Sequence, residues 1–248
     1  MTTFAPYLLV VLALVLAITA FLYASVGHGG ASGYLALMAL VSFPVAEMRP
    51  TALLLNIGVA GVSFFFFKKA NHFRWRLFWP FALTSIPAAF LGGSIETDPV
   101  IYKQILAVFL IIAILRMLGV SAKGKLEPRA AHLLLSLLIG ALIGLFSGMI
   151  GIGGGILLSP VIVLLGWGNL KEAAAVSALF ILANSISGMS GFLFSGGEVP
   201  DISWVILPIA LLGGSLGAYY GSMRYKGVVL RYLLAFVLLI ASVKLFLV

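Results

Sequence analysis

The chain has 248 residues, of which 62% are hydrophobic and only 9% are charged. A soluble domain carries roughly 25% charged residues, so this composition excludes an ordinary soluble protein. There is no cysteine, which excludes disulfides, thiolate metal sites and cysteine nucleophiles. The net charge of +8 lies mostly in short loops between apolar runs, a pattern that favours a membrane rather than nucleic acid as the partner.

Apolar runs follow one another along the whole chain, starting with an N-terminal run that is too long for a signal peptide and that we expect to be kept. They cover residues 6–26, 31–45, 50–67, 78–94, 100–118, 130–149, 155–167, 172–194, 202–221 and 228–247. Most can cross the bilayer, but the runs at 31–45 and 155–167 fall short of the roughly 20 residues that a spanning helix needs. We therefore expect an all-α polytopic membrane protein with about ten hydrophobic segments, one of them in each half a short, half-membrane helix.

The two halves of the chain resemble each other. Residues 86–94 and 207–215 are identical at six of nine aligned positions, and the glycine-rich residues 27–30 align with 151–154. The aligned segments lie half a chain apart, which indicates an internal duplication. We expect two transmembrane repeats, residues 1–124 and 125–248, within one integrated membrane domain.

Loop charges predict how the repeats are oriented. The loop at 68–76 carries four basic residues, whereas its counterpart at 195–201 has only acidic charges. The next pair reverses this bias, since 96–103 is mainly acidic and 224–231 is basic; the linker at 116–129 is also basic. Because basic loops stay in the cytoplasm, equivalent loops lie on opposite sides. The pattern predicts inverted-topology repeats in a multi-pass protein of the cell inner membrane, with both termini outside.

Two clusters of glycines interrupt the apolar pattern just before the short runs. Each glycine destabilises a helix by about 1 kcal/mol relative to alanine, and the freed backbone groups need partners within the protein. A helix that begins inside the membrane presents N–H groups and a positive dipole end, which favour an anion. We predict a substrate site at these glycines: Gly27, Gly29, Gly30, Gly151, Gly153, Gly154 and Gly155. The alternative is close helix packing, which we favour for Gly92-Gly93 and Gly213-Gly214.

Two ionisable residues accompany this pattern. His28 lies within the first glycine cluster, where its imidazole could bind the substrate anion or couple transport to a proton. The alternative is a neutral histidine bonded to a freed carbonyl group. Arg49 could attract anions to a vestibule, or could anchor its helix at the membrane interface.

Amide and hydroxyl side chains could complete an anion site. Asn56 and Asn184 lie in the middle of equivalent runs, and each amide can donate two hydrogen bonds without carrying a charge. Interhelical bonding explains such amides equally well. Ser32, Thr51 and Ser177 could add hydroxyl donors, although helical serine and threonine more often bond to their own backbone.

These motifs resemble the TauE/SafE sulfite-exporter family of membrane permeases. The resemblance lies in the second glycine cluster with Ser159-Pro160, in residues 174–179 (AAVSAL) and in Asn184-Ser185; residues 27–30, 49–53 and Asn56 form a degenerate first copy. It covers essentially the whole chain. It implies a transporter for a small sulfur-containing anion such as sulfite, sulfoacetate or another organosulfonate.

Alternating access between the two repeats is the mechanism that we expect. An anion channel, or a transporter of a different small organic anion, remains the alternative. An enzyme is not expected, because the sequence offers no paired buried carboxylates and no nucleophile with an obvious base. We expect no cofactor, no metal and no nucleic acid; the partners are the anion, the lipid bilayer and a possible second copy of the chain.

Overall fold

The structure, a computed structural model, describes residues 6–96, 98–105, 107–108, 111 and 131–223. Several expected features lie outside the described residues. They are most of the fifth run, the tenth run, the basic linker and the proposed boundary between residues 124 and 125. Within them every regular element is a helix.

The first half contains α1 (Pro6–Ala24), α2 (Ala31–Leu40), α3 (Val45–Lys69) and α4 (Trp75–Ser94), followed by a helical segment at 99–105. The second half contains α6 (Leu133–Ile150), α7 (Gly155–Leu164), α8 (Leu170–Phe194) and α9 (Asp201–Met223). Five described helices, α3, α4, α6, α8 and α9, are long and apolar enough to cross a membrane. The expected all-α membrane fold is confirmed. The short runs are also short helices of ten residues each, about 15 Å long.

The start of α3 differs from the sequence prediction. The helix begins at Val45 rather than at residue 50, so Pro50 lies inside it. Pro50 is the sixth residue of the helix, so its missing N–H leaves the carbonyl of Ala46 without the usual helical partner, a cost that the packing around the buried Pro50 has to offset. Pro44 caps the helix, and the carboxylate of Glu47 in its first turn suits the positive end of the helix dipole.

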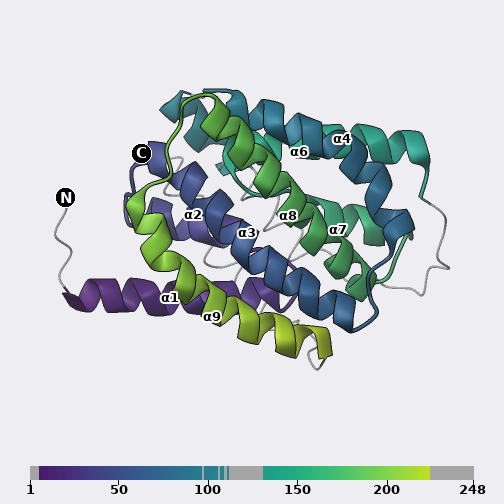
Figure 1. Cartoon of the computed structure of the whole chain (residues 1–248), viewed down its shortest axis with the longest axis horizontal. Helices are drawn as coiled ribbons and strands as arrows, with labels where there is room; N and C mark the ends of the chain where they lie inside the picture. The colour runs from purple at the N-terminus through teal and green to yellow at the C-terminus, as the bar shows by residue number, and fades with distance from the viewer. Residues whose placement is uncertain (1–5, 97, 106, 109–110, 112–130, 224–248) are drawn as a thin grey trace.

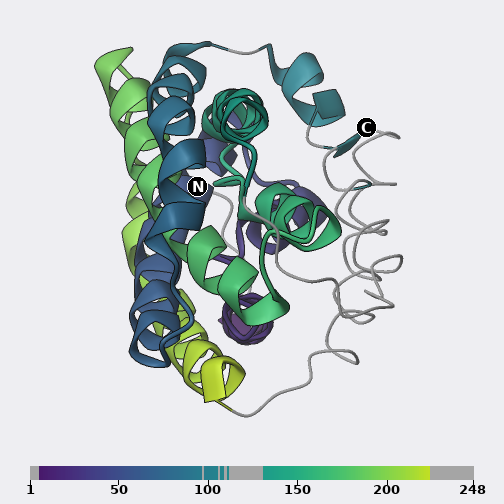
Figure 2. The ribbon, with the colours of Figure 1, turned by 90° about the vertical axis from the view of Figure 1, so that its right-hand side faces the viewer.

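Helices α3 and α8 lie side by side at the centre of the bundle and run in opposite directions (Figure 1). Arg74, just after α3, bonds to Glu172 in the first turn of α8. At the other end Arg49 lies over the ring of Phe192, near the end of α8. Figure 2 shows the short helices α2 and α7 between α1 and α6, which are seen nearly end-on.

The remaining helices pack in two parallel pairs through glycines. In α4 and α6, a Cβ atom at Gly148 would collide with the carbonyl of Ala89; in α1 and α9, one at Gly217 would collide with that of Phe21. Substitutions at Gly93 and Gly213 would meet backbone carbonyls in the same way. The packing role predicted for the Gly92-Gly93 and Gly213-Gly214 pairs is therefore confirmed.

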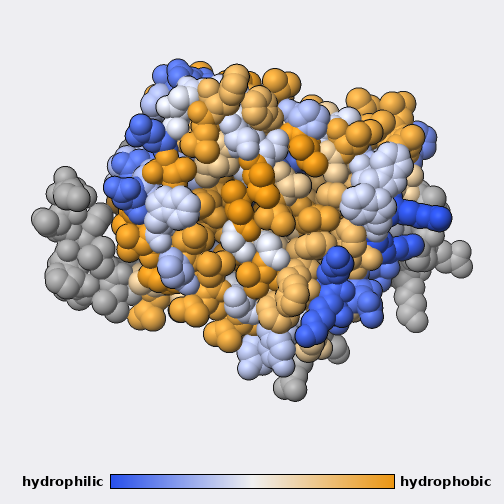
Figure 3. Space-filling model, in the orientation of Figure 1, coloured by the Kyte–Doolittle hydropathy of each residue, from blue (hydrophilic) through white to orange (hydrophobic). Residues whose placement is uncertain are grey.

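The surface is hydrophobic over its broad middle and hydrophilic at its two ends (Figure 3). One end, called here the acidic end, carries Glu47, Glu96, Asp98, Glu198 and Asp201. The other, called the basic end, carries Lys68, Lys69, Arg74, Arg76 and Lys171. The 25 residues of α3 connect the two ends over about 37 Å, enough to cross a bilayer.

Candidate functional site

Both short helices begin inside the protein. Gly30 (φ 100°) and Gly154 (φ 80°) are the N-caps of α2 and α7, and glycine adopts this left-handed conformation without steric cost. All residues from Gly27 to Ala31 and from Gly151 to Ile156 are buried. The N-terminal N–H groups of two helices therefore point into the core rather than into water.

The two glycine breaks meet at Asn56. The backbone N–H of Ala31, the first residue of α2, donates to Asn56 Oδ1 at 3.1 Å. A Cβ atom at Gly29 would collide with the same oxygen, and one at Gly153 would lie 2.8 Å from Asn56 Nδ2 and 3.0 Å from Ser185 Oγ. One buried amide thus contacts the breaks of both halves.

Several buried polar atoms have no hydrogen-bond partner among the described residues. Asn56 Nδ2 and Ser185 Oγ lie at Gly153, and both amide atoms of Asn184 belong to the residue before Ser185; all three side chains are 0% exposed. An unsatisfied buried polar group costs about 1–3 kcal/mol. Asn184 lies in the same stretch of α8 as Ile181, which packs against Gly29, Gly153 and Gly155. Unpaired donors beside two helix N-termini are the groups that a bound anion would satisfy.

His28 connects the first break to the second half. Its Nδ1 lies 2.9 Å from the carbonyl oxygen of Val26, which can only accept, so Nδ1 carries the hydrogen. Its Nε2 lies 3.3 Å from Ser159 Oγ, and Ser159 Oγ lies 2.6 Å from Ser177 Oγ. Ser159 Oγ also lies 3.1 Å from the carbonyl oxygen of Gly155. Imidazole and two hydroxyl groups form a continuous buried chain along α7.

Other predicted residues have partners elsewhere. Ser32 donates to the hydroxyl of Tyr23 at 2.9 Å, and Thr51 Oγ1 lies 2.7 Å from Ser203 Oγ of α9. Of the glycines, Gly27 packs on Ala174, Gly30 on Tyr34, Gly151 on Arg49 and Gly154 on Ser147. The structure brings Gly29, Asn56 and Gly153 together, and His28 with Ser177. It adds Ser159 and Ser185, which the sequence signals only by their places beside the glycine cluster and Asn184.

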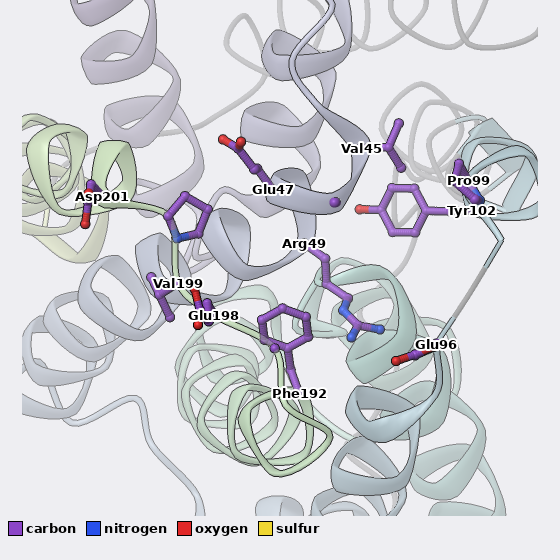
Figure 4. A pocket seen from close by; sticks show the side chains of 13 residues that line it. Val45, Glu47, Arg49, Glu96, Pro99, Tyr102, Phe192, Glu198, Val199 and Asp201 are labelled. Atoms are coloured by element: carbon purple, nitrogen blue, oxygen red, sulfur yellow. The ribbon is translucent and has the colours of Figure 1, made fainter. Parts of the chain in front are cut away.

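A cavity of about 670 Å³ opens at the acidic end (Figure 4). Carboxylates of Glu47, Glu96, Glu198 and Asp201 line it together with Arg49, Tyr102 and Phe192. Within the part of the chain that the structure describes, no three histidine or carboxylate side chains lie close enough to hold a metal ion. We call this cavity the vestibule.

Comparisons with known proteins agree with this architecture. The sulfite exporter TauE/SafE family matches residues 12–245. The chain belongs to this family. It is 36% identical to the probable membrane transporter protein y4hK of Sinorhizobium fredii, over 94% of this chain and 96% of that protein. It is 30% identical to a probable membrane transporter protein of Haemophilus influenzae, over 81% and 80% of the two chains. No solved structure is significantly similar.

A TauE/SafE protein with several apolar spans is a multi-pass membrane transporter. The buried amides, hydroxyls and helix N-termini lie within this membrane-spanning bundle. Helix packing is the alternative for any glycine-rich membrane helix, and it explains Gly92 and Gly148. It does not account for the unpaired Nδ2 of Asn56 or for the two unpaired amide atoms of Asn184.

Proposed function

We propose that the protein is a secondary transporter of the cell inner membrane for a small sulfur-containing anion, such as sulfite, sulfoacetate or another organosulfonate. One observation carries this proposal: the glycine breaks before two short helices meet at one buried amide, where polar side-chain atoms lack partners. Each helix N-terminus carries about half a positive charge, so together they favour a single anion. Gly29, Gly153, Asn56, Asn184 and Ser185 would surround it.

Alternating access is supported by the directions of the helices. Equivalent helices of the two halves run oppositely, as α3 and α8 do. Helix α9 begins at the acidic end and reaches the basic end, where Lys171 Nζ donates to the carbonyl of Ser222. Helix α4 runs the other way, from Trp75 at the basic end to Ser94 at the acidic end. Two inverted repeats that share a central site can expose it first to one end and then to the other. The basic end would face the cytoplasm.

His28 would couple transport to a proton. In the neutral imidazole, Nε2 accepts a hydrogen bond from Ser159. In the imidazolium, Nε2–H donates instead, and the Ser159 hydroxyl turns towards Gly155 O at the start of α7. Protonation would therefore reverse the hydroxyl chain beside the proposed anion site. Among the groups that face His28 are the hydroxyl of Ser159, which connects to that of Ser177, and the carbonyl of Val26.

Thermal unfolding of the purified protein against sulfite, sulfoacetate, taurine, sulfate, phosphate and chloride tests this proposal. A ligand of the folded state stabilises it by about 2.7 kcal/mol at a hundred times its dissociation constant. We expect one sulfur oxyanion or sulfonate to raise the midpoint, and Asn184→Ala to abolish this shift. Gly61→Ala is the control, because a Cβ atom there would meet nothing closer than 3.8 Å. A midpoint that rises only with cations or neutral solutes would contradict the proposal.

A saturable flux would separate a transporter from a channel. A transporter exchanges its substrate faster when the opposite side holds unlabelled substrate, whereas a channel shows no such stimulation.

A further inference from the structure

Arg49 is a buried charged residue at the acidic end of the bundle. Its side chain is only 8% exposed, and its guanidinium donates to the carbonyl oxygens of Gly93 and Ile95, both at 2.9 Å. It also reaches the carbonyl of Met149 at 3.5 Å and lies 4.7 Å from the centre of the Phe192 ring. A buried charge persists only where other groups compensate it, and here the carbonyls at the ends of α4 and α6 do so.

These contacts join the two halves of the chain. Arg49 belongs to the first half, whereas Met149 and Phe192 belong to the second. Tyr102 makes a parallel connection, because its buried hydroxyl donates to the carbonyl of Ile150 at 2.9 Å. Both side chains thus hold the last two residues of α6, directly before the second glycine break.

The same residues lie between the vestibule and the proposed anion site. Arg49, Tyr102 and Phe192 line the vestibule on one side (Figure 4). On the other side, Gly151 packs on the backbone of Arg49, and Gly153 follows it to Asn56. An anion that takes this route between the acidic end and Asn56 passes this layer.

An oxyanion can compete for Arg49. The recorded bonds to neutral carbonyls use three of its five N–H groups. Charge-assisted bonds to an anionic oxygen are roughly twice as strong as bonds between neutral groups. The vestibule carboxylates repel negative charge, and the guanidinium offsets this repulsion where an anion reaches it.

We propose that Arg49 and Tyr102 form the gate at the acidic end, and that an oxyanion such as a sulfonate opens it by drawing the guanidinium away from the Met149 and Ile95 carbonyls. The proposal rests on the proposed function for the identity of the anion. The gate itself follows from contacts that exist without substrate. A purely structural role for Arg49, as a cap on α4 and α6, would affect stability but not the access of a reagent from one end.

Thiol labelling tests the gate, because the chain contains no cysteine of its own. The reporter is Ser185→Cys, which faces Gly153 behind the gate; the controls are Val199→Cys in the vestibule and Lys69→Cys at the basic end. A small cationic methanethiosulfonate reagent is added to sealed vesicles. Vesicles with the acidic end outward are identified by fast labelling of Val199→Cys and slow labelling of Lys69→Cys.

In these vesicles Arg49→Gln should speed labelling of the reporter by about tenfold or more, given the usual worth of charged hydrogen bonds. Tyr102→Phe should give a smaller increase, and Arg49→Lys should lie between Arg49→Gln and the parent. Methanesulfonate should speed labelling in the parent background, while chloride at the same concentration should not. Labelling of Val199→Cys should stay constant throughout.

Equal reporter labelling in the parent, Arg49→Gln and Tyr102→Phe would overturn the gate. If Arg49→Gln does not accumulate in the membrane, Tyr102→Phe decides. Faster labelling in the variants with no effect of methanesulfonate would leave the gate but remove the anion as its trigger. That outcome, with no thermal shift by any sulfur anion, would count against the proposed function and not against the gate.

Discussion

Asn56 and Asn184 occupy equivalent helices but differ in their contacts, and this difference predicts different responses to leucine. Asn56→Leu removes one unpaired donor, Nδ2, but strands the N–H of Ala31 that now bonds to Oδ1. These effects cancel. Asn184→Leu removes two unpaired buried atoms and strands none. Overpacking by the larger leucine costs about 1–3 kcal/mol of stability at each position, and we take this cost as equal when the two variants are compared. Asn184→Leu should therefore be the more stable variant by about 2 kcal/mol or more.

The assay is thermal unfolding in detergent without anions, followed by tryptophan fluorescence. For a chain of this size about 2 kcal/mol corresponds to about 4–8 °C in the midpoint. Asn184→Leu should also lose the rise in midpoint that the substrate anion gives the parent, because its amide donors are gone. If the two variants melt at the same temperature, Asn184 has a partner within the protein, and the argument that it awaits a ligand fails.

Three further predictions concern packing, pH and helix capping. Gly93→Ala should strongly reduce the yield of folded protein, because its Cβ atom would meet the Gly188 carbonyl. Gly61→Ala should leave stability unchanged or raise it by up to about 1 kcal/mol. The yield and the thermal midpoint of each variant check both expectations. Burial, with the nearby charge of Lys171, lowers the pKa of His72 below its usual 6.5, so the unfolded state takes up a proton first as the pH falls. Stability should drop below about pH 6.5, and the drop should be smaller in His72→Gln; an equal drop contradicts the assignment. Asn169→Ala should cost about 1 kcal/mol in chemical denaturation, since it removes the capping box with Glu172.

Local patterns in the sequence were enough to predict the main elements. The lengths of the runs predicted the short helices α2 and α7, and the paired glycines predicted close helix packing, although not that α8 is the partner of Gly93. The start of α3 was placed too late, because proline is typical of the first helical turn and Pro50 therefore suggested a start at position 50 instead of Val45.

The candidate site could be predicted only in part. Asn56 and the glycine breaks were found because both interrupt an apolar run. The partners of Ser32 and Thr51 depend on which face of a helix they occupy, and Ser203 is 152 positions from Thr51. The environment of Arg49 gave no sequence signal at all. Its acceptors are backbone carbonyls, which any residue supplies, and they lie 44, 46 and 100 positions away.

Exchange of radiolabelled sulfoacetate or sulfite across proteoliposomes tests the central claim most directly. The account predicts saturable uptake that is stimulated by unlabelled substrate on the opposite side, lost in Asn184→Leu and retained in Gly61→Ala. Absence of stimulated uptake for every sulfur anion, with protein that is folded and correctly inserted, would contradict the account.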